Sequence, residues 1–259
     1  MHWYGLTDGW YTLDAGGVEL FHLNPRLIEA TPHRQWRTPF LDYNVIRLLD
    51  DVLELLPHAI DPIPPDLLDL VRTPELHKAF DERSYRWSES SWTPRPTQPT
   101  REDMEQFAAR SDFWDHAAGW WLEAPNLAGG YQPGQPDVRF WSEGGSVIIR
   151  WDECLQVHKE TGLRWNTQPP GEYSLPIATF IAEVRQFHAR LMEQMRHRLD
   201  IAKHNWPLPN VHIDIDDMEN EHDWRSHAFD EAMEMSRKVR RDWDKVRWAM
   251  AEVIRLVGE

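Results

Sequence analysis

The sequence predicts an α+β protein in which an antiparallel sheet packs against several long helices. Strand-like segments come in two batches, an N-terminal meander and a central hairpin block, and helical segments follow each batch. Short turns join the strands of each batch, and the chain lacks the strand–helix alternation that is typical of a parallel sheet. Apolar residues make up 41% of the 259 residues, which is enough for a substantial core.

The first batch is predicted to be a β-meander. Residues 3–7 form an aromatic-rich strand, Asp8-Gly9 is a tight-turn dipeptide, and residues 10–13 form a second strand. Ala15-Gly16-Gly17 then predicts a turn into a third strand over residues 18–23. These strands are expected to supply one part of the sheet.

Apolar residues at helical spacing predict the helices. The first begins at Phe40 and stops before Pro57. Thr73-Pro74 and Thr100 are typical helix starts, because each offers a hydroxyl to the first turn. The predicted helices are 40–56, 66–71, 74–87, 101–121, 176–202 and 229–256.

The second batch of strands is predicted around a Gly-Gly turn. Residues 138–141 and 146–151 flank Glu143-Gly144-Gly145, which indicates a hairpin. Residues 163–167 and 172–174 are candidates for further strands. We expect residues 1–259 to form one α+β domain, with the Ser/Thr/Pro-rich segment 88–100 as the candidate boundary between two lobes.

The formal net charge of −15 is concentrated in two segments. Residues 50–82 carry nine acidic and two basic residues, and residues 212–235 carry nine acidic residues and one basic residue. Such a balance disfavours nucleic acid and anionic membranes as partners, since both require basic residues. The segments are interpreted either as solvated helix faces or as a surface that attracts a basic protein.

The second acidic segment holds the candidate site. In an extended segment, His212, Asp214 and Asp216 would share one face and could bind a divalent metal. Alternatively, Asp214 or Asp216 caps a helix that begins near Asp217. If the segment instead binds a protein, the candidate contact residues are Asp214, Asp216, Asp217, Glu219, Glu221, Asp223, Trp224 and Trp92.

The sequence contains 15 Trp residues, of which most are expected in the core. Trp3, Trp10, Trp141 and Trp151 lie on predicted strands, and Trp243 and Trp248 lie on the last predicted helix. Some of the Trp residues in loops and at helix ends are expected to be exposed, where Trp favours binding surfaces. These are Trp36, Trp87, Trp92, Trp165 and Trp224.

No cofactor motif and no catalytic signature is present, since the chain lacks a Walker A loop, a G-x-G-x-x-G turn and a G-x-S-x-G elbow. A single cysteine, Cys154, and the absence of a signal-peptide pattern and of any long apolar run favour a cytoplasmic protein. We therefore expect no cofactor, and a binding protein rather than an enzyme.

Three stretches carry a family resemblance: residues 2–11, residues 138–152 around Val138-Arg139-Phe140-Trp141, and residues 180–188. Together they resemble an uncharacterised bacterial family catalogued as a domain of unknown function. Members of that family look like the small acidic α+β immunity proteins of bacterial toxin systems. The resemblance implies a protein that neutralises a basic partner such as a toxin. The alternative hypothesis is a metal- or small-molecule-binding enzyme with its site around His212, Asp214 and Asp216.

Overall fold

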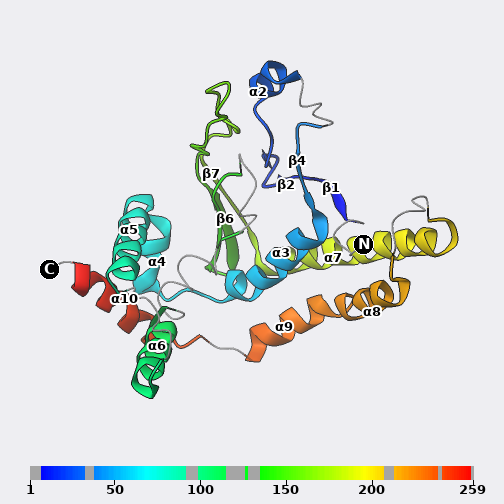
Figure 1. The fold of residues 1–259 in the computed structure, drawn as a ribbon. Helices are drawn as coiled ribbons and strands as arrows, with labels where there is room; N and C mark the ends of the chain where they lie inside the picture. The colour runs from blue at the N-terminus through cyan, green and yellow to red at the C-terminus, as the bar shows by residue number, and fades with distance from the viewer. Residues whose placement is uncertain are drawn as a thin grey trace. The chain divides into compact units, whose positions relative to one another are not determined.

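The fold was examined in a computed structural model that describes residues 7–32, 38–91, 99–114, 126–127, 135–206, 213–238 and 241–257. It confirms the α+β class (Figure 1). The strands are β1 (Asp8–Tyr11), β2 (Leu13–Asp14), β3 (Glu19–Leu20), β4 (Leu41–Asn44), β5 (Val138–Glu143), β6 (Ser146–Trp151) and β7 (Gly171–Pro176). The helices are α2 (Pro25–Ala30), α3 (Val45–Ile60), α4 (Pro65–Arg72), α5 (Pro74–Ser91), α6 (Arg101–Trp114), α7 (Ile177–Asn205), α8 (Ile215–Arg225), α9 (Ala228–Lys238) and α10 (Trp243–Val257).

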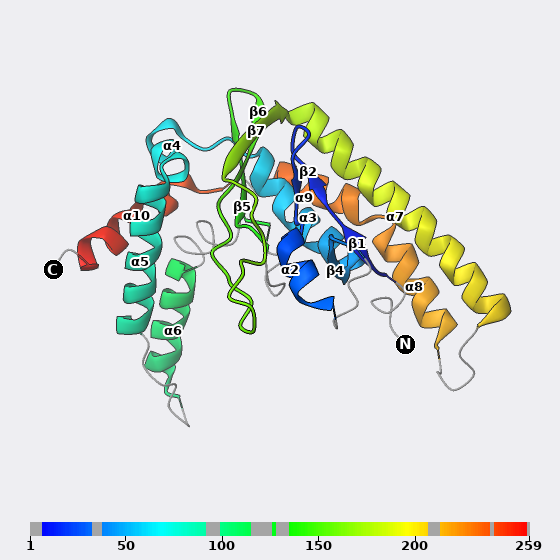
Figure 2. The ribbon, with the colours of Figure 1, turned by 90° about the horizontal axis from the view of Figure 1, so that it is seen from above.

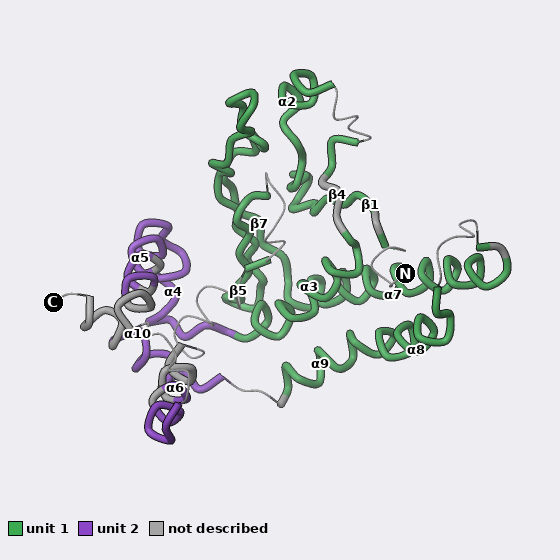
Figure 3. Tube along the Cα trace, viewed as in Figure 1, with its two compact units in different colours: residues 1–61, 126–238 green, residues 62–125, 239–259 purple. Residues whose placement is uncertain are grey.

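The chain divides into two compact units, each built from two stretches of sequence (Figure 3). Unit 1 comprises residues 1–61 and 126–238, and unit 2 comprises residues 62–125 and 239–259. The Ser/Thr/Pro-rich segment 88–100 falls within unit 2, and its residues 92–98 lie outside the described residues. Every residue of the second acidic segment that the structure describes belongs to unit 1.

The central hairpin block is confirmed as a three-stranded antiparallel sheet in the order β5-β6-β7. Its hairpin turns at Gly144 and Gly145, which both have positive φ (57° and 83°), as a tight turn of this hand requires. Alternate residues of β6 are buried, as expected for a strand with one face on the core. The predicted strand over 163–167 is reduced to an isolated bridge between Val157 and Arg164.

The N-terminal meander is only partly confirmed, since the described strands form sheets separate from the central block. β2 and β3 form the predicted hairpin around Gly16-Gly17. Asp8-Gly9, however, is not a turn: it belongs to β1, which pairs with β4 in the register Asp8 to Asn44. The predicted strand 3–7 lies almost wholly outside the described residues. A pairing between segments more than thirty residues apart therefore overrides the local turn pattern.

The first long helix was predicted with the wrong ends. Residues 41–44, assigned to the helix by their spacing, form β4, and α3 begins at Val45, whose N–H donates to the Thr7 carbonyl (2.9 Å). The helix also continues past Pro57 to Ile60. Ala59, in the turn after the proline, is fully buried.

Helix α2 and the division between α9 and α10 were not predicted from the sequence. α2 begins directly after Asn24, whose side chain accepts a hydrogen bond from the Arg26 N–H (3.0 Å). The predicted helix 229–256 is wrong as a single element, because the structure ends α9 at Lys238 and begins α10 at Trp243. Asp242 caps the second of these helices by accepting from the Lys245 N–H (3.2 Å), which favours a new start over a continuous helix.

Unit 1 is built around α3 and α7. Both helices pack against the three-stranded sheet, while α8 packs on α7 and α9 packs on α3 (Figures 1 and 2). Figure 2 shows α8 running alongside α7. The core between these layers is apolar, and its fully buried side chains include Leu20, Phe21, Ile46, Leu49, Leu56, Met195, Leu199 and Met218. The sheet and two helices thus form the support on which α8 and α9 are held.

Unit 2 is helical in its described part, with α5 in contact with α4 and α10. The Arg247 guanidinium on α10 forms a bidentate ion pair with Asp66 on α4 (2.7 and 3.0 Å). The predicted start of α6 is confirmed: Thr100 Oγ1 accepts from the Asp103 N–H (3.2 Å), and the Asp103 carboxylate accepts from the Thr100 N–H (2.7 Å).

No helix among the described residues combines the length and the apolar character that crossing a bilayer requires.

Candidate functional site

The start of α8 tests the capping interpretation of the second acidic segment. Asp214 is the N-cap of α8, and its carboxylate accepts a hydrogen bond from the Asp217 N–H (3.1 Å). The helix begins at Ile215, so Asp214 and Asp216 do not alternate along a strand. The capping interpretation is therefore confirmed, and acids in the first turn are favoured by the helix dipole.

The predicted metal ligands are only partly described. His212 lies outside the described residues, and Asp216 is exposed in the first turn of α8. Within the described ranges, no three His, Cys, Asp or Glu side chains are grouped so that they could hold one metal ion. The metal hypothesis for His212, Asp214 and Asp216 stays a prediction.

Several acids of α8 are paired within the chain. Glu219 forms ion pairs with Lys203 and with Arg196 (3.6 Å), and Asp223 also pairs with Arg196 (3.2 Å). Both cations lie on α7. These contacts fasten α8 to α7, so part of the negative charge counted in the sequence is used to hold the helix in place.

A buried cation lies at the end of α8 and joins the two acidic segments. Arg225 is only 5% exposed, and its guanidinium contacts Asp50 on α3 (2.6 Å) and Glu221 one turn earlier on α8 (2.8 Å). Burial by itself lowers the pKa of Arg225, but the hydrogen bonds that its guanidinium donates to Asp50 and Glu221 outweigh burial and raise that pKa. The cation is therefore kept, and it fixes the position of α8 relative to α3.

Two buried histidines bind α8 to α7 through the backbone. His188 Nε2 donates to the Arg225 carbonyl (2.8 Å), and His222 Nε2 donates to the Met192 carbonyl (3.1 Å). Because Nε2 of His222 carries the proton, its Nδ1 accepts from Arg196 Nη2 (2.9 Å). Both imidazoles are thus engaged in holding the two helices together.

Trp224 is the exposed aromatic residue of the segment. Its side chain is 53% exposed, and the Arg225 guanidinium lies 4.5 Å from its ring centroid. A cation at that distance from an indole face attracts it and limits its movement. Because the ion pair with Asp50 fixes Arg225, the exposed indole packs against a side chain that is held in place.

We use the name acidic face for a set of exposed acidic and apolar residues on α8 and α9. On α8 they are spaced by two turns, Asp216 with Asp223 and Asp217 with Trp224, and on α9 by three or four residues, which places each set along one side of its helix. Apolar contact area comes from Trp224 and from Met235, both more than half exposed. The acidic face consists of Asp216, Asp217, Asp223, Trp224, Asp230, Glu231, Glu234 and Met235.

The first acidic segment is divided between the two units. Asp50, Asp51 and Glu54 lie on α3 in unit 1, whereas Asp66, Asp69, Glu75 and Glu82 lie in unit 2. Asp50 contacts the second segment through Arg225, and α3, which carries Asp50, also packs on α9. In unit 1 the two segments therefore meet at a buried ion pair.

The tryptophans follow the prediction unevenly. Trp141 and Trp151 are buried, as expected of most of the tryptophans, whereas Trp10 and Trp248 are exposed. Of the five residues expected to supply exposed rings, Trp224 is exposed and Trp165 is half-buried. Trp36 and Trp92 lie outside the described residues, and the side chain of Trp87 is not described.

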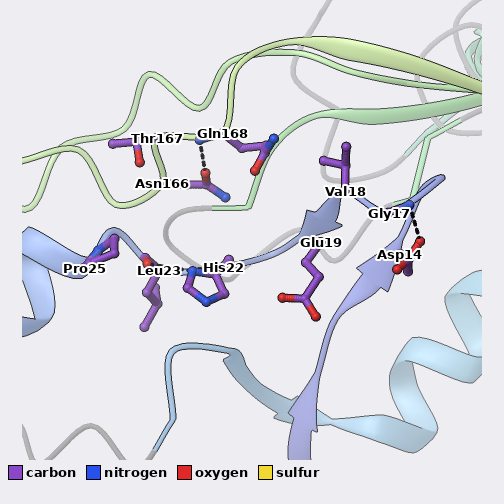
Figure 4. A pocket seen from close by; sticks show the side chains of 10 residues that line it. All are labelled: Asp14, Gly17, Val18, Glu19, His22, Leu23, Pro25, Asn166, Thr167 and Gln168. Atoms are coloured by element: carbon purple, nitrogen blue, oxygen red, sulfur yellow. Dashed lines mark hydrogen bonds between the residues drawn. The ribbon is translucent and has the colours of Figure 1, made fainter.

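A pocket that the sequence did not predict lies elsewhere in unit 1 (Figure 4). Its volume is about 520 Å³, within the range of small-ligand sites. One wall comes from the β2–β3 hairpin and the residues after it, and the other comes from the loop between β6 and β7. The lining residues are Asp14, Gly17, Val18, Glu19, His22, Leu23, Pro25, Asn166, Thr167 and Gln168.

Asn24 connects the two walls of this pocket. Its N–H donates to the Trp165 carbonyl (2.7 Å), and its side-chain Nδ2 donates to the Arg164 carbonyl (2.9 Å). The Glu19-x-x-His22 spacing was visible in the sequence, but its strand context gave no reason to place both residues at a site. Only the contact with a loop some 140 residues away creates the second wall.

Fold and site together define an α+β protein with an acidic helical face held on a rigid core. The chain belongs to a family of unknown function, DUF5984, whose sequence model matches residues 1–249. No curated protein matches the chain. No solved structure matches it either.

Proposed function

We propose that this protein is a protein-binding module that captures a basic protein through the acidic face of α8 and α9. The observation that carries the proposal is Trp224, a half-exposed indole. Its ring packs against Arg225, which is buried and paired with Asp50. Tryptophan is enriched among the residues that dominate binding energy at protein interfaces. A ring that is already fixed loses little conformational entropy when a partner covers it.

The charge around Trp224 selects the kind of partner. Asp216 and Asp217 lie exposed at the start of α8, and α9 adds Asp230, Glu231 and Glu234. Clustered charge of one sign accelerates the capture of a partner of opposite charge and suppresses partners of like charge. A basic protein is therefore the partner that this face favours. A toxin neutralised by an immunity protein is the specific case that the family resemblance suggests.

The test is a binding measurement with the captured partner. Tagged protein is used to isolate its partner from the organism that encodes it, and the dissociation constant is then measured with both proteins purified. Trp224→Ala is expected to weaken binding by about 30-fold, as loss of an interface hot spot does. The matched control is Trp10→Ala, which removes another exposed indole of unit 1 outside the acidic face.

Two results would contradict the proposal. One is a partner whose affinity Trp224→Ala leaves unchanged while Trp10→Ala reduces it. The other is a partner that is itself acidic. For the immunity case, co-expression must also restore growth to cells that produce the captured protein, and Trp224→Ala must reduce that rescue.

A further inference from the structure

The pocket of Figure 4 brings two carboxylates together on one face of the β2–β3 hairpin. Asp14 and Glu19 are directly opposed in the ladder register, and both line the pocket. Residues opposed in this way project to the same side of a hairpin, and like charges at such positions repel each other. Asp14 uses one oxygen to accept from the Gly17 N–H (2.8 Å). A cation bound at this side of the hairpin would relieve the repulsion.

His22 adds a third acceptor because the backbone leaves the strand geometry at Phe21. Phe21 has φ of 65°, a strained value for a bulky residue, and its side chain is fully buried, as is that of Leu20. The break in alternation places His22 on the pocket side with Glu19. The Nδ1–H of His22 donates to the Leu23 carbonyl (3.1 Å), so Nε2 is left as an acceptor.

The opposite wall offers a donor that the protein does not use. Asn166 is only 2% exposed, and its Oδ1 accepts from the Gln168 N–H (2.6 Å). Its Nδ2 is buried and has no hydrogen-bond partner in the described part of the chain. Figure 4 shows this nitrogen directed into the space between the two walls. Buried donors are rarely left unpaired, which points to a ligand that supplies an acceptor there.

A ligand that fits this pocket must therefore carry several hydrogen-bond donors at one end and one acceptor at the other. A single metal ion does not meet this demand, since the described side chains include no group of three that could hold one. A guanidinium presents five N–H donors in a planar fork and suits carboxylates better than an ammonium does. In an arginine residue, an amide carbonyl lies at the other end of the side chain.

We infer that this pocket binds the guanidinium group of arginine, with Asp14, Glu19 and His22 accepting its N–H groups and Asn166 donating to the ligand's carbonyl. The pocket volume of about 520 Å³ accommodates one such side chain. The ligand is either an arginine residue within a peptide or the free amino acid. The inference is independent of the acidic face, because none of the pocket residues belongs to α8 or α9.

The test uses small probes with the full-length protein. N-acetyl-L-arginine amide is titrated while the amide spectrum is followed by NMR, and saturation is expected below about 5 mM. N-acetyl-L-citrulline amide has nearly the same shape without the charge, and its affinity is expected to be at least about tenfold lower. Free L-arginine separates the two sources: tighter binding than the blocked probe assigns the pocket to the free amino acid, and weaker binding assigns it to a peptide residue.

Variants then locate the binding. Glu19→Gln is expected to weaken the arginine probe about tenfold or more, because it removes a charged acceptor but keeps the size of the side chain. Asp14→Asn is a second variant that still accepts from Gly17. Glu29→Gln, an exposed acid on α2 outside the pocket, is the matched control and leaves the affinity unchanged.

Three results would overturn the inference. They are the absence of saturation by about 10 mM, equal affinity for the citrulline probe, and equal losses in Glu19→Gln and Glu29→Gln. The amide spectrum of each variant shows directly whether it is folded. Because no partner protein takes part, failure here leaves the Trp224 experiment unaffected.

Discussion

Gly16 and Gly17 form the turn of the β2–β3 hairpin, and the two glycines have different surroundings. Both have positive φ, at 67° and 88°. A Cβ added to Gly16 would lie 2.5 Å from the ring of Tyr173 on β7, whereas a Cβ on Gly17 would meet nothing within 4 Å. The hairpin and the three-stranded sheet therefore approach each other closely at Gly16.

This difference predicts unequal costs for the same substitution. Gly17→Ala only places an L residue in the left-handed region, which lowers the free energy of unfolding by about 1 kcal/mol. Gly16→Ala adds the collision with Tyr173 and is expected to cost about 2–3 kcal/mol. Urea unfolding of both variants measures the difference. Equal losses would show that Tyr173 does not pack on the turn.

Asp51 on α3 is a second residue whose environment only the fold reveals. Its Oδ2 is buried and has no hydrogen-bond partner within the described ranges. Burial raises the pKa of Asp51 from its ordinary value of 3.8 to about 6, against the opposing influence of Arg47. The sequence showed only an acid in a charged segment.

The raised pKa predicts a pH-dependent stability. Folded Asp51 keeps its proton up to about pH 6 while the unfolded chain releases it near pH 4, so the free energy of unfolding falls as the pH rises between these values. Asp51→Asn removes this penalty and is expected to stabilise by roughly 1–2 kcal/mol at pH 7, with little gain near pH 4. Urea unfolding at both pH values tests this. Glu183→Gln, an exposed acid on α7, is the control and should show no such pH-dependent gain.

At the scale of elements, α8 shows how a local signal and a tertiary contact combine. Asp214 begins the helix by accepting from the Asp217 N–H (3.1 Å), a pattern readable in the sequence. The direction in which the helix lies is set by Arg225, His188 and His222, which contact α3 and α7. Residues 175 positions apart meet at the Arg225–Asp50 ion pair, and no local pattern predicts that.

Loss of the cap has a defined cost. Asp214→Ala leaves an N–H of the first turn without its acceptor and is expected to lower the free energy of unfolding by about 1 kcal/mol. Asp214→Ser retains a capping oxygen and should recover most of that loss. Thermal or urea unfolding distinguishes them. A loss in Asp214→Ser equal to that in Asp214→Ala would show that the carboxylate contributes through its charge rather than through the hydrogen bond.

At the scale of the whole molecule, the division into two units separates two groups of exposed acids, one from each acidic segment. Asp216 and Asp217 lie on the acidic face of unit 1, while Glu75 and Glu82 lie on α5 in unit 2. All four are exposed. If the acidic face steers the partner, only charges in that face should change the association rate strongly.

The double variant Asp216→Asn/Asp217→Asn is therefore expected to slow association with the basic partner about three- to tenfold at low salt. The same removal of two charges in Glu75→Gln/Glu82→Gln should have a much smaller effect. Raising the salt concentration to about 0.5 M should reduce the difference, because screening shortens the reach of exposed charges. Stopped-flow association kinetics provide the measurement, and a larger effect from the α5 pair would contradict the assignment.

The sequence by itself determined the α+β class, the central hairpin and the helix starts at Pro74 and Arg101. These depend on periodicity and on caps within a few residues, which act through local hydrogen bonds and local burial. The tertiary structure alone decided that residues 41–44 pair with β1, that α9 and α10 are separate helices in different units, and that the walls of the pocket meet. These features depend on contacts between distant segments, whose free energy exists only once the chain has brought them together.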